Sequence, residues 1–179
     1  MSATASPVSP AHAAADPLPG SLGADIGLLV LRVVVGVVMA AHGTQKLFGW
    51  FHGNGLSATG RFFEAKGYPA GKTMAVIAGL SETFGGLGLI VGLLTPLAAA
   101  AVMGVMINAV AVKSGFFAPK GYEYELVLLA AVVTLALIGP GRLALDRAVP
   151  ALRHYRLVYG VAAIVLAAVV AGVVLSMRD

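Results

Sequence analysis

The sequence predicts an all-α membrane protein: an antiparallel bundle of four transmembrane helices plus a fifth, C-terminal transmembrane helix. Hydrophobic residues make up 59% of the 179-residue chain and charged residues only 11%. The apolar residues gather in five long runs, and a helix needs roughly 17 to 25 of them to cross a bilayer. These runs are continuous rather than alternating, so they favour helices over a closed β-barrel.

The first 24 residues are expected to form a disordered tail. They are rich in Ala, Ser and Pro and contain no Lys or Arg. A secretory signal needs a basic start followed by an apolar core, and the segment offers neither. We therefore expect the tail to contribute little to folding.

The first spanning helix is predicted over residues 26–48, and an amphipathic segment follows it. Residues 57–66 (SATGRFFEAK) combine two adjacent phenylalanines with basic and acidic residues. This pattern is typical of a short helix that lies at the membrane interface. Gly67 and Pro69 should end it.

Four further apolar runs complete the predicted bundle. Thr95-Pro96 leaves almost no loop between the second and third runs, so these two should form a tight antiparallel hairpin. The Gly139-Pro140-Gly141 sequence should stop the fourth run. The predicted helices cover residues 73–94, 97–112, 122–138 and 155–177.

The basic residues lie mostly between the apolar runs, where they act as topology signals rather than as a nucleic-acid surface. Apart from Arg32, seven Lys or Arg fall in the first and third loops and at the C-terminus, and four fall on the opposite side. The positive-inside rule then favours an external N-terminus and a cytoplasmic C-terminus.

The chain contains no cysteine. It therefore forms no disulfide and no thiolate metal site, and it performs no thiol chemistry itself. We predict no metal site. Any redox role would require a bound cofactor or a partner protein.

Ionisable residues inside the apolar runs are the best candidates for function, because burying them in a bilayer is costly. A rise of about 1.5 Å per residue places His42 roughly 9 Å deep, Glu82 roughly 13 Å and Asn108 roughly 6 Å below the surface that holds the first loop. Small residues flank Glu82 at helical spacing, so it should face protein rather than lipid. The hypothesis is one polar pocket for a ligand or for protons, formed by His42, Lys46, Glu82, Asn108, Tyr124 and Glu125.

Structural explanations compete with this hypothesis. Lys46 ends its helix and could extend to the lipid headgroups. Arg32 could do the same at the opposite surface, or pair with Glu82. A hydrogen bond between His42 and Glu82 could simply hold two helices together. The glutamates at positions 123 and 125 could be solvated interface residues.

Four sequence motifs occur in order along residues 26–147. They are AHGTQKLFGWF at 41–51, SETFGG at 81–86, GFFAPKGYEY at 115–124 and GPGRLALD at 139–146. Through them the chain resembles the DoxX family of small bacterial membrane proteins. The resemblance implies a four-helix domain over residues 25–147 in the bacterial cell membrane, with residues 148–179 as an additional helix. It also marks Arg32, Gly43, Tyr122 and Glu123 as family-motif residues.

The resemblance implies a redox-related function. The family takes its name from a subunit linked to thiosulfate and quinone oxidation, and a mycobacterial relative looks like the membrane partner of a superoxide dismutase and a sulfurtransferase. The first hypothesis is therefore a membrane subunit of an oxidoreductase or oxidative-stress and thiol-stress defence system, with a quinone-like molecule as the expected ligand.

Two other functions stay open. The chain could be a non-catalytic membrane anchor for soluble redox enzymes, or a small proton-coupled transporter. Its partners would be the lipid bilayer in every case, with soluble redox enzymes or further copies of the chain as additional candidates. Whether the chain is itself an enzyme is left open.

Overall fold

The computed structural model describes residues 21–178, and this part of the chain is helical without strands. The predicted all-α fold is confirmed, whereas most of the predicted N-terminal tail lies outside the described residues. The helices are α1 (Leu22–Phe48), α2 (Gly55–Glu64), α3 (Gly71–Val91), α4 (Thr95–Ala111), α5 (Glu123–Ile138) and α6 (Leu157–Ser176), with a short 3-10 turn η1 (Leu145–Arg147). The first helix begins earlier than residue 26 because the Ser21 side chain caps it by accepting a hydrogen bond from the Ala24 amide.

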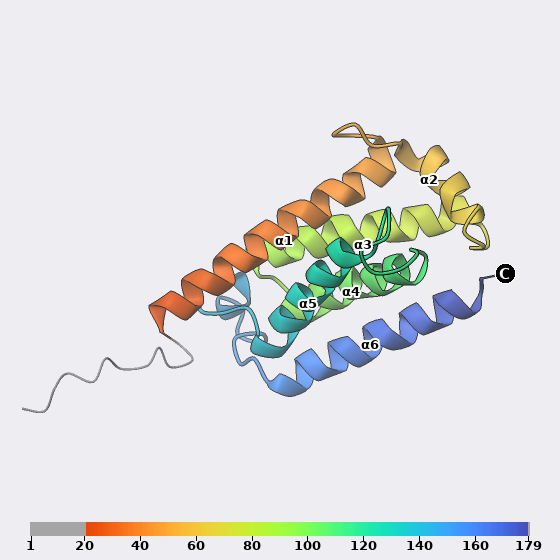
Figure 1. The fold of residues 1–179 in the computed structure, drawn as a ribbon. Helices are drawn as coiled ribbons and strands as arrows, with labels where there is room; N and C mark the ends of the chain where they lie inside the picture. The colour runs from red at the N-terminus through yellow and green to blue at the C-terminus, as the bar shows by residue number, and fades with distance from the viewer. Residues whose placement is uncertain (1–20, 179) are drawn as a thin grey trace, which may run out of the picture.

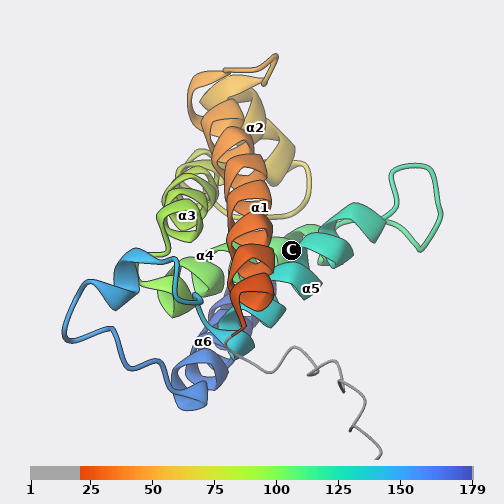
Figure 2. The ribbon, with the colours of Figure 1, turned by 90° about the vertical axis from the view of Figure 1, so that its left-hand side faces the viewer.

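Five apolar helices run back and forth along one direction, and α2 lies across one end of them (Figure 1). Viewed from the N-terminal end of α1, α3 and α5 flank α1 on either side (Figure 2). Helix α6 packs against α4 and α5. The predicted interfacial segment forms α2, and the turn at residues 92–94 gives the predicted tight hairpin between α3 and α4.

Three helices, α1, α3 and α6, are long and apolar enough to cross a membrane, and α4 is a shorter apolar helix. Together with the all-helical fold, they make the chain a helical membrane protein. The shortest apolar helix is α5, with 16 residues. The division into four spans plus a fifth stays a prediction.

Glycines bring α1 and α3 into backbone contact. A Cβ atom added to Gly43 would lie 2.6 Å from the Gly79 carbonyl oxygen, and one added to Gly86 would lie 2.5 Å from the Gly36 carbonyl oxygen. Close approach of this kind is the usual role of small residues between membrane helices. On each helix the two glycines are seven residues apart, and together they fix the position of α1 on α3.

A hydrophobic core joins all five apolar helices. Its members come from α1, α3, α4, α5 and α6, and the most deeply buried large side chains are Met39, Leu89, Val102, Met103, Val132 and Leu135. These side chains fill the centre of the bundle. The polar residues lie toward its two ends.

Candidate functional site

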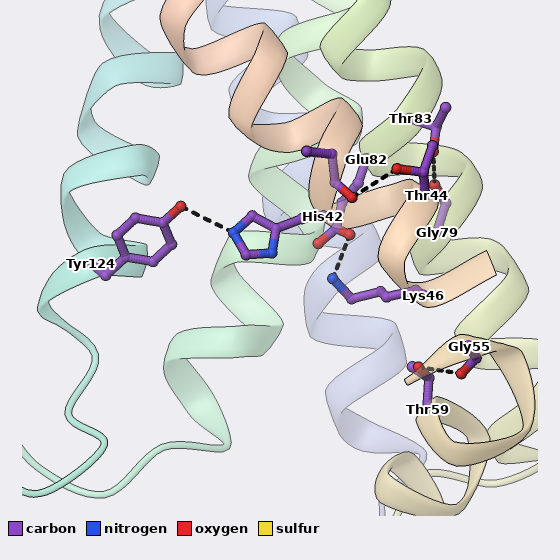
Figure 3. Close-up of polar contacts among 10 residues, drawn as sticks. His42, Thr44, Lys46, Gly55, Thr59, Gly79, Glu82, Thr83 and Tyr124 are labelled. Atoms are coloured by element: carbon purple, nitrogen blue, oxygen red, sulfur yellow. Dashed lines mark hydrogen bonds and ion pairs between the residues drawn. The ribbon is translucent and has the colours of Figure 1, made fainter. Parts of the chain in front are cut away.

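Lys46 on α1 and Glu82 on α3 form an ion pair at 2.5 Å (Figure 3). Glu82 is only 1% exposed, as its small neighbours predicted. The side chain of Lys46 does not extend to the lipid headgroups, because its ammonium is held inside the bundle by the carboxylate of Glu82.

His42 contacts Tyr124 rather than Glu82. Its Nε2 atom lies 3.1 Å from the Tyr124 hydroxyl oxygen, and Figure 3 shows this hydrogen bond beside the Lys46–Glu82 pair. The hypothesis of a hydrogen bond between His42 and Glu82 is wrong. Lys46 lies one turn further along the same face of α1, and its longer side chain reaches the Glu82 carboxylate and pairs with it.

A second ion pair joins the end of α4 to the start of α5. The Lys113 ammonium lies 2.6 Å from Oε1 of Glu125, whose side chain is 11% exposed. Oε2 of the same carboxylate is buried and has no hydrogen-bond partner. Glu125 is therefore a buried group rather than a solvated one. Glu123, in contrast, accepts a hydrogen bond from the Phe117 amide at the exposed surface.

Asn108 belongs to a different contact, with a residue that the sequence did not reveal. The Tyr68 hydroxyl donates to Asn108 Oδ1 at 3.0 Å, and Asn108 Nδ2 donates to the Gly104 carbonyl at 2.9 Å. Burial raises the pKa of the Tyr68 hydroxyl, and the charge of Arg178 opposes this shift. The only sequence signal was an aromatic residue between Gly67 and Pro69 in an interfacial loop.

One groove brings these contacts together. It has a volume of about 1020 Å³ and runs between α6 and the opposing surfaces of α3, α4 and α5. Most of its wall is apolar, with polar side chains gathered toward the end that α2 covers. All six residues of the predicted pocket line it, namely His42, Lys46, Glu82, Asn108, Tyr124 and Glu125.

The remaining family-motif residues have other positions. Arg32 is completely buried, and its Nη2 atom donates to the Leu143 carbonyl at 2.6 Å. It neither reaches the lipid headgroups nor pairs with Glu82, because the loop after α5 folds over it. Gly43 lies in the α1–α3 contact, and Tyr122 packs its ring against Phe116.

The loop that covers Arg32 contains one acidic residue, Asp146, and pairs with a second, Asp25 of α1, neither of which the sequence gave reason to single out. Asp146 accepts hydrogen bonds from the amides of Leu94 and Thr95, at 2.7 and 3.1 Å, and so caps the start of α4. Asp25 pairs with Arg142 at 2.5 Å. The GPGRLALD motif therefore ties helix ends together, away from the groove.

The polar end of the groove gathers groups that donate and accept hydrogen bonds. It offers an imidazole, phenol hydroxyls, ammonium groups and carboxylates. Apolar walls with a few convergent polar groups are the usual composition of a ligand site. Within residues 21–178, no three His, Asp or Glu residues cluster as metal ligands.

Comparison with known proteins places the chain in a family. The sequence model of DoxX matches residues 27–115. A Bacillus subtilis (strain 168) protein named "Putative oxidoreductase CatD" is 32% identical over 126 residues, which cover 68% of this chain and 86% of that protein. The chain belongs to the DoxX family. No solved structure matches it significantly.

The DoxX match runs from α1 to just beyond α4. It includes His42, Lys46, Glu82 and Asn108, whereas Tyr124 and Glu125 on α5 lie after it. Helix α6, which forms one wall of the groove in this DoxX protein, also lies outside the match.

Proposed function

We propose that this chain is an integral membrane subunit of an oxidoreductase system and that its groove binds a quinone-like molecule. Membership of the DoxX family, together with similarity to a protein named as an oxidoreductase, supports the redox-related role. The observation that carries the ligand proposal is the groove itself, where the Lys46–Glu82 pair and the His42–Tyr124 hydrogen bond lie in a mostly apolar wall.

The polar end of the groove suits a quinone head. A quinone has two carbonyl oxygens that accept hydrogen bonds, and it supplies two-electron redox chemistry when bound. Lys46, His42 and Tyr124 are the donors that would hold these oxygens. His42 and Glu82 would hold or release protons there, because both can exist in protonated and unprotonated forms.

Redox chemistry at such a site needs an electron donor or acceptor, and the chain contains no cysteine that could serve as one. We therefore include a soluble redox enzyme as a partner, of the superoxide dismutase or sulfurtransferase class that the family resemblance implies. A role in oxidative-stress or thiol-stress defence belongs to the same proposal, as does a cytoplasmic position for the α2 end.

Quinone content tests this proposal. The full chain is purified from a quinone-containing bacterial membrane, and the extracted lipids are analysed by chromatography and absorbance. We expect about one quinone per protein for the wild type and for the lipid-facing control Val165→Ala. The double variant Lys46→Met/Glu82→Leu removes both charges together and should lose the quinone while remaining folded.

Two results would contradict the ligand proposal. One is equal quinone content in the wild type, the double variant and empty membrane. The other is a quinone-free bundle that co-purifies with soluble redox enzymes, which would favour the anchor function. An oxidative-stress complementation assay with the same double variant provides a second readout, because the proposal requires a stable but inactive protein.

A further inference from the structure

A second, smaller pocket lies between the end of α1, the loop after it and α2. Its volume is about 360 Å³. We call it the surface pocket, because two of its lining residues, His52 and Asn54, are exposed. In contrast to the apolar groove, most of its lining residues are polar, namely His42, Gln45, Lys46, His52, Asn54 and Thr59.

The surface pocket and the groove share one wall. His42, Lys46, Phe62 and Phe63 line both of them. The two phenylalanines have no polar side-chain atom, and the ammonium of Lys46 is held by Glu82. His42 is therefore the group in this wall through which a proton can pass from one side to the other.

The two ring nitrogens of His42 point to different sides of this wall. Nε2 lies 3.1 Å from the hydroxyl of Tyr124, which lines the groove but not the surface pocket. Figure 3 shows Nδ1 directed away from Tyr124, toward the side where Lys46 and Thr59 lie, and Thr59 lines the surface pocket but not the groove. An imidazole placed in this way can take up a proton at one nitrogen and release one from the other.

The charged groups near His42 are already paired with one another. Lys46 on α1 pairs with Glu82 on α3, and Glu125 on α5 pairs with Lys113. Both carboxylates line the groove together with His42. Because each has its own lysine, neither holds the ring permanently in its charged form, and the imidazole can cycle between its two states.

A strained loop brings a second imidazole to the surface pocket. Phe51 and His52 have φ angles of +51° and +63°, which residues other than glycine rarely adopt unless their surroundings impose them. Here Gln45 Nε2 donates to the Phe51 carbonyl at 3.1 Å, and Gly53 packs so closely that an added Cβ would lie 2.6 Å from the Gln45 Cα. These contacts hold His52 at the exposed edge of the pocket.

We propose that the surface pocket holds water and supplies protons to the groove through His42, with His52 exchanging them at the surface. A proton from the pocket binds Nδ1 of the neutral ring, and the Nε2 proton then leaves toward the Tyr124 hydroxyl and a water molecule or ligand in the groove. Rotation of the ring restores the first tautomer. One proton is transferred and no electron moves. The inference rests on the proposed function for the use of these protons, and it adds their route.

A reversible plug tests the route in the folded protein. The chain contains no cysteine, so Ala58→Cys can be modified with benzyl methanethiosulfonate in lipid nanodiscs and freed again by a reductant. Ala58 lines the surface pocket but not the groove, whereas its exposed neighbour Ser57 lines neither, so Ser57→Cys carries the matched control plug. Proton exchange between water and the His42 ring is measured by ¹⁵N NMR of the histidine-labelled full chain, without added quinone.

We expect the plug at Ala58 to slow this exchange at least about tenfold, because it excludes water from one side of the ring. The reductant should restore the exchange, and the plug at Ser57 should leave it unchanged. His52→Gln should also slow it, and added imidazole buffer should restore it by replacing the missing carrier. The control His154→Gln, in the exposed loop before α6, should exchange like the wild type.

The inference is overturned if the two plugs behave alike, if His52→Gln exchanges as fast as the wild type, or if water does not exchange protons with the unplugged His42 ring. The proposed function would still stand in these cases if quinone co-purifies with the wild type and is lost from Lys46→Met/Glu82→Leu. A quinone-free protein whose exchange responds to the plug would instead reject the proposed function and retain the proton route.

Discussion

Replacing Lys46 with methionine should leave a buried carboxylate without its partner. Glu82 is 1% exposed, and the side chain of Lys46 is 23% exposed. Removing one member of a buried pair typically costs about 3–5 kcal/mol. Partial exposure of Lys46, together with proton uptake by the isolated Glu82, lowers this figure, so we expect a loss of about 2–3 kcal/mol in the free energy of unfolding.

SDS-induced unfolding in mixed micelles, followed by circular dichroism, measures this loss. Lys72→Met is the matched control, because Lys72 is an exposed lysine at the start of α3 and its replacement should change stability by less than about 0.5 kcal/mol. The double variant Lys46→Met/Glu82→Leu removes both charges and should recover most of the loss. The reasoning fails if Lys46→Met is as stable as Lys72→Met, or if the double variant is no more stable than Lys46→Met.

Three further predictions follow from the helix contacts. Gly43→Ala should destabilise the protein by about 1–3 kcal/mol in the same assay, because the added Cβ would collide with the α3 backbone. The control Gly27→Ala should have little effect, because no atom lies within 4 Å of its added Cβ. Equal effects of the two substitutions would exclude the α1–α3 contact. Asp146→Ala should cost about 1–2 kcal/mol through loss of the α4 cap, and an unchanged unfolding midpoint would show that water replaces the carboxylate. The chain contains no cysteine, so single cysteines can be introduced at Pro150 and at Arg178. We expect an impermeant thiol reagent to label these two positions from opposite sides of the membrane. Labelling of both from the same side would show that α6 does not span the membrane.

Local sequence features predicted the helices and the burial of Glu82. Apolar runs fix where helices form in a membrane protein, because every backbone group in lipid must be hydrogen-bonded internally. Glu82 was identified as protein-facing from the glycines beside it, and the structure places two of these, Gly79 and Gly86, against α1.

Side-chain partners could not be predicted in the same way. Helical spacing placed His42 and Lys46 on one face but gave neither the reach of each side chain nor its direction, so it did not identify Lys46 as the partner of Glu82. Arg32 contacts Leu143, which is 111 positions away, and Tyr68 contacts Asn108 across 40. Such pairs depend on how the helices pack, and one sequence carries no direct signal of that packing.

The cap of α4 has a consequence for how the protein is made. The two amides at the start of this helix are satisfied by Asp146, which is synthesised about fifty residues later. The Asp25 carboxylate likewise has no ion-pair partner until Arg142 has been synthesised. A nascent chain that has inserted only α1 to α4 therefore holds uncompensated polar groups at the α3–α4 turn, and these groups weaken the early hairpin. Arrival of the segment after α5 completes both contacts at once, so the bundle reaches its final stability only after the ribosome has passed residue 146.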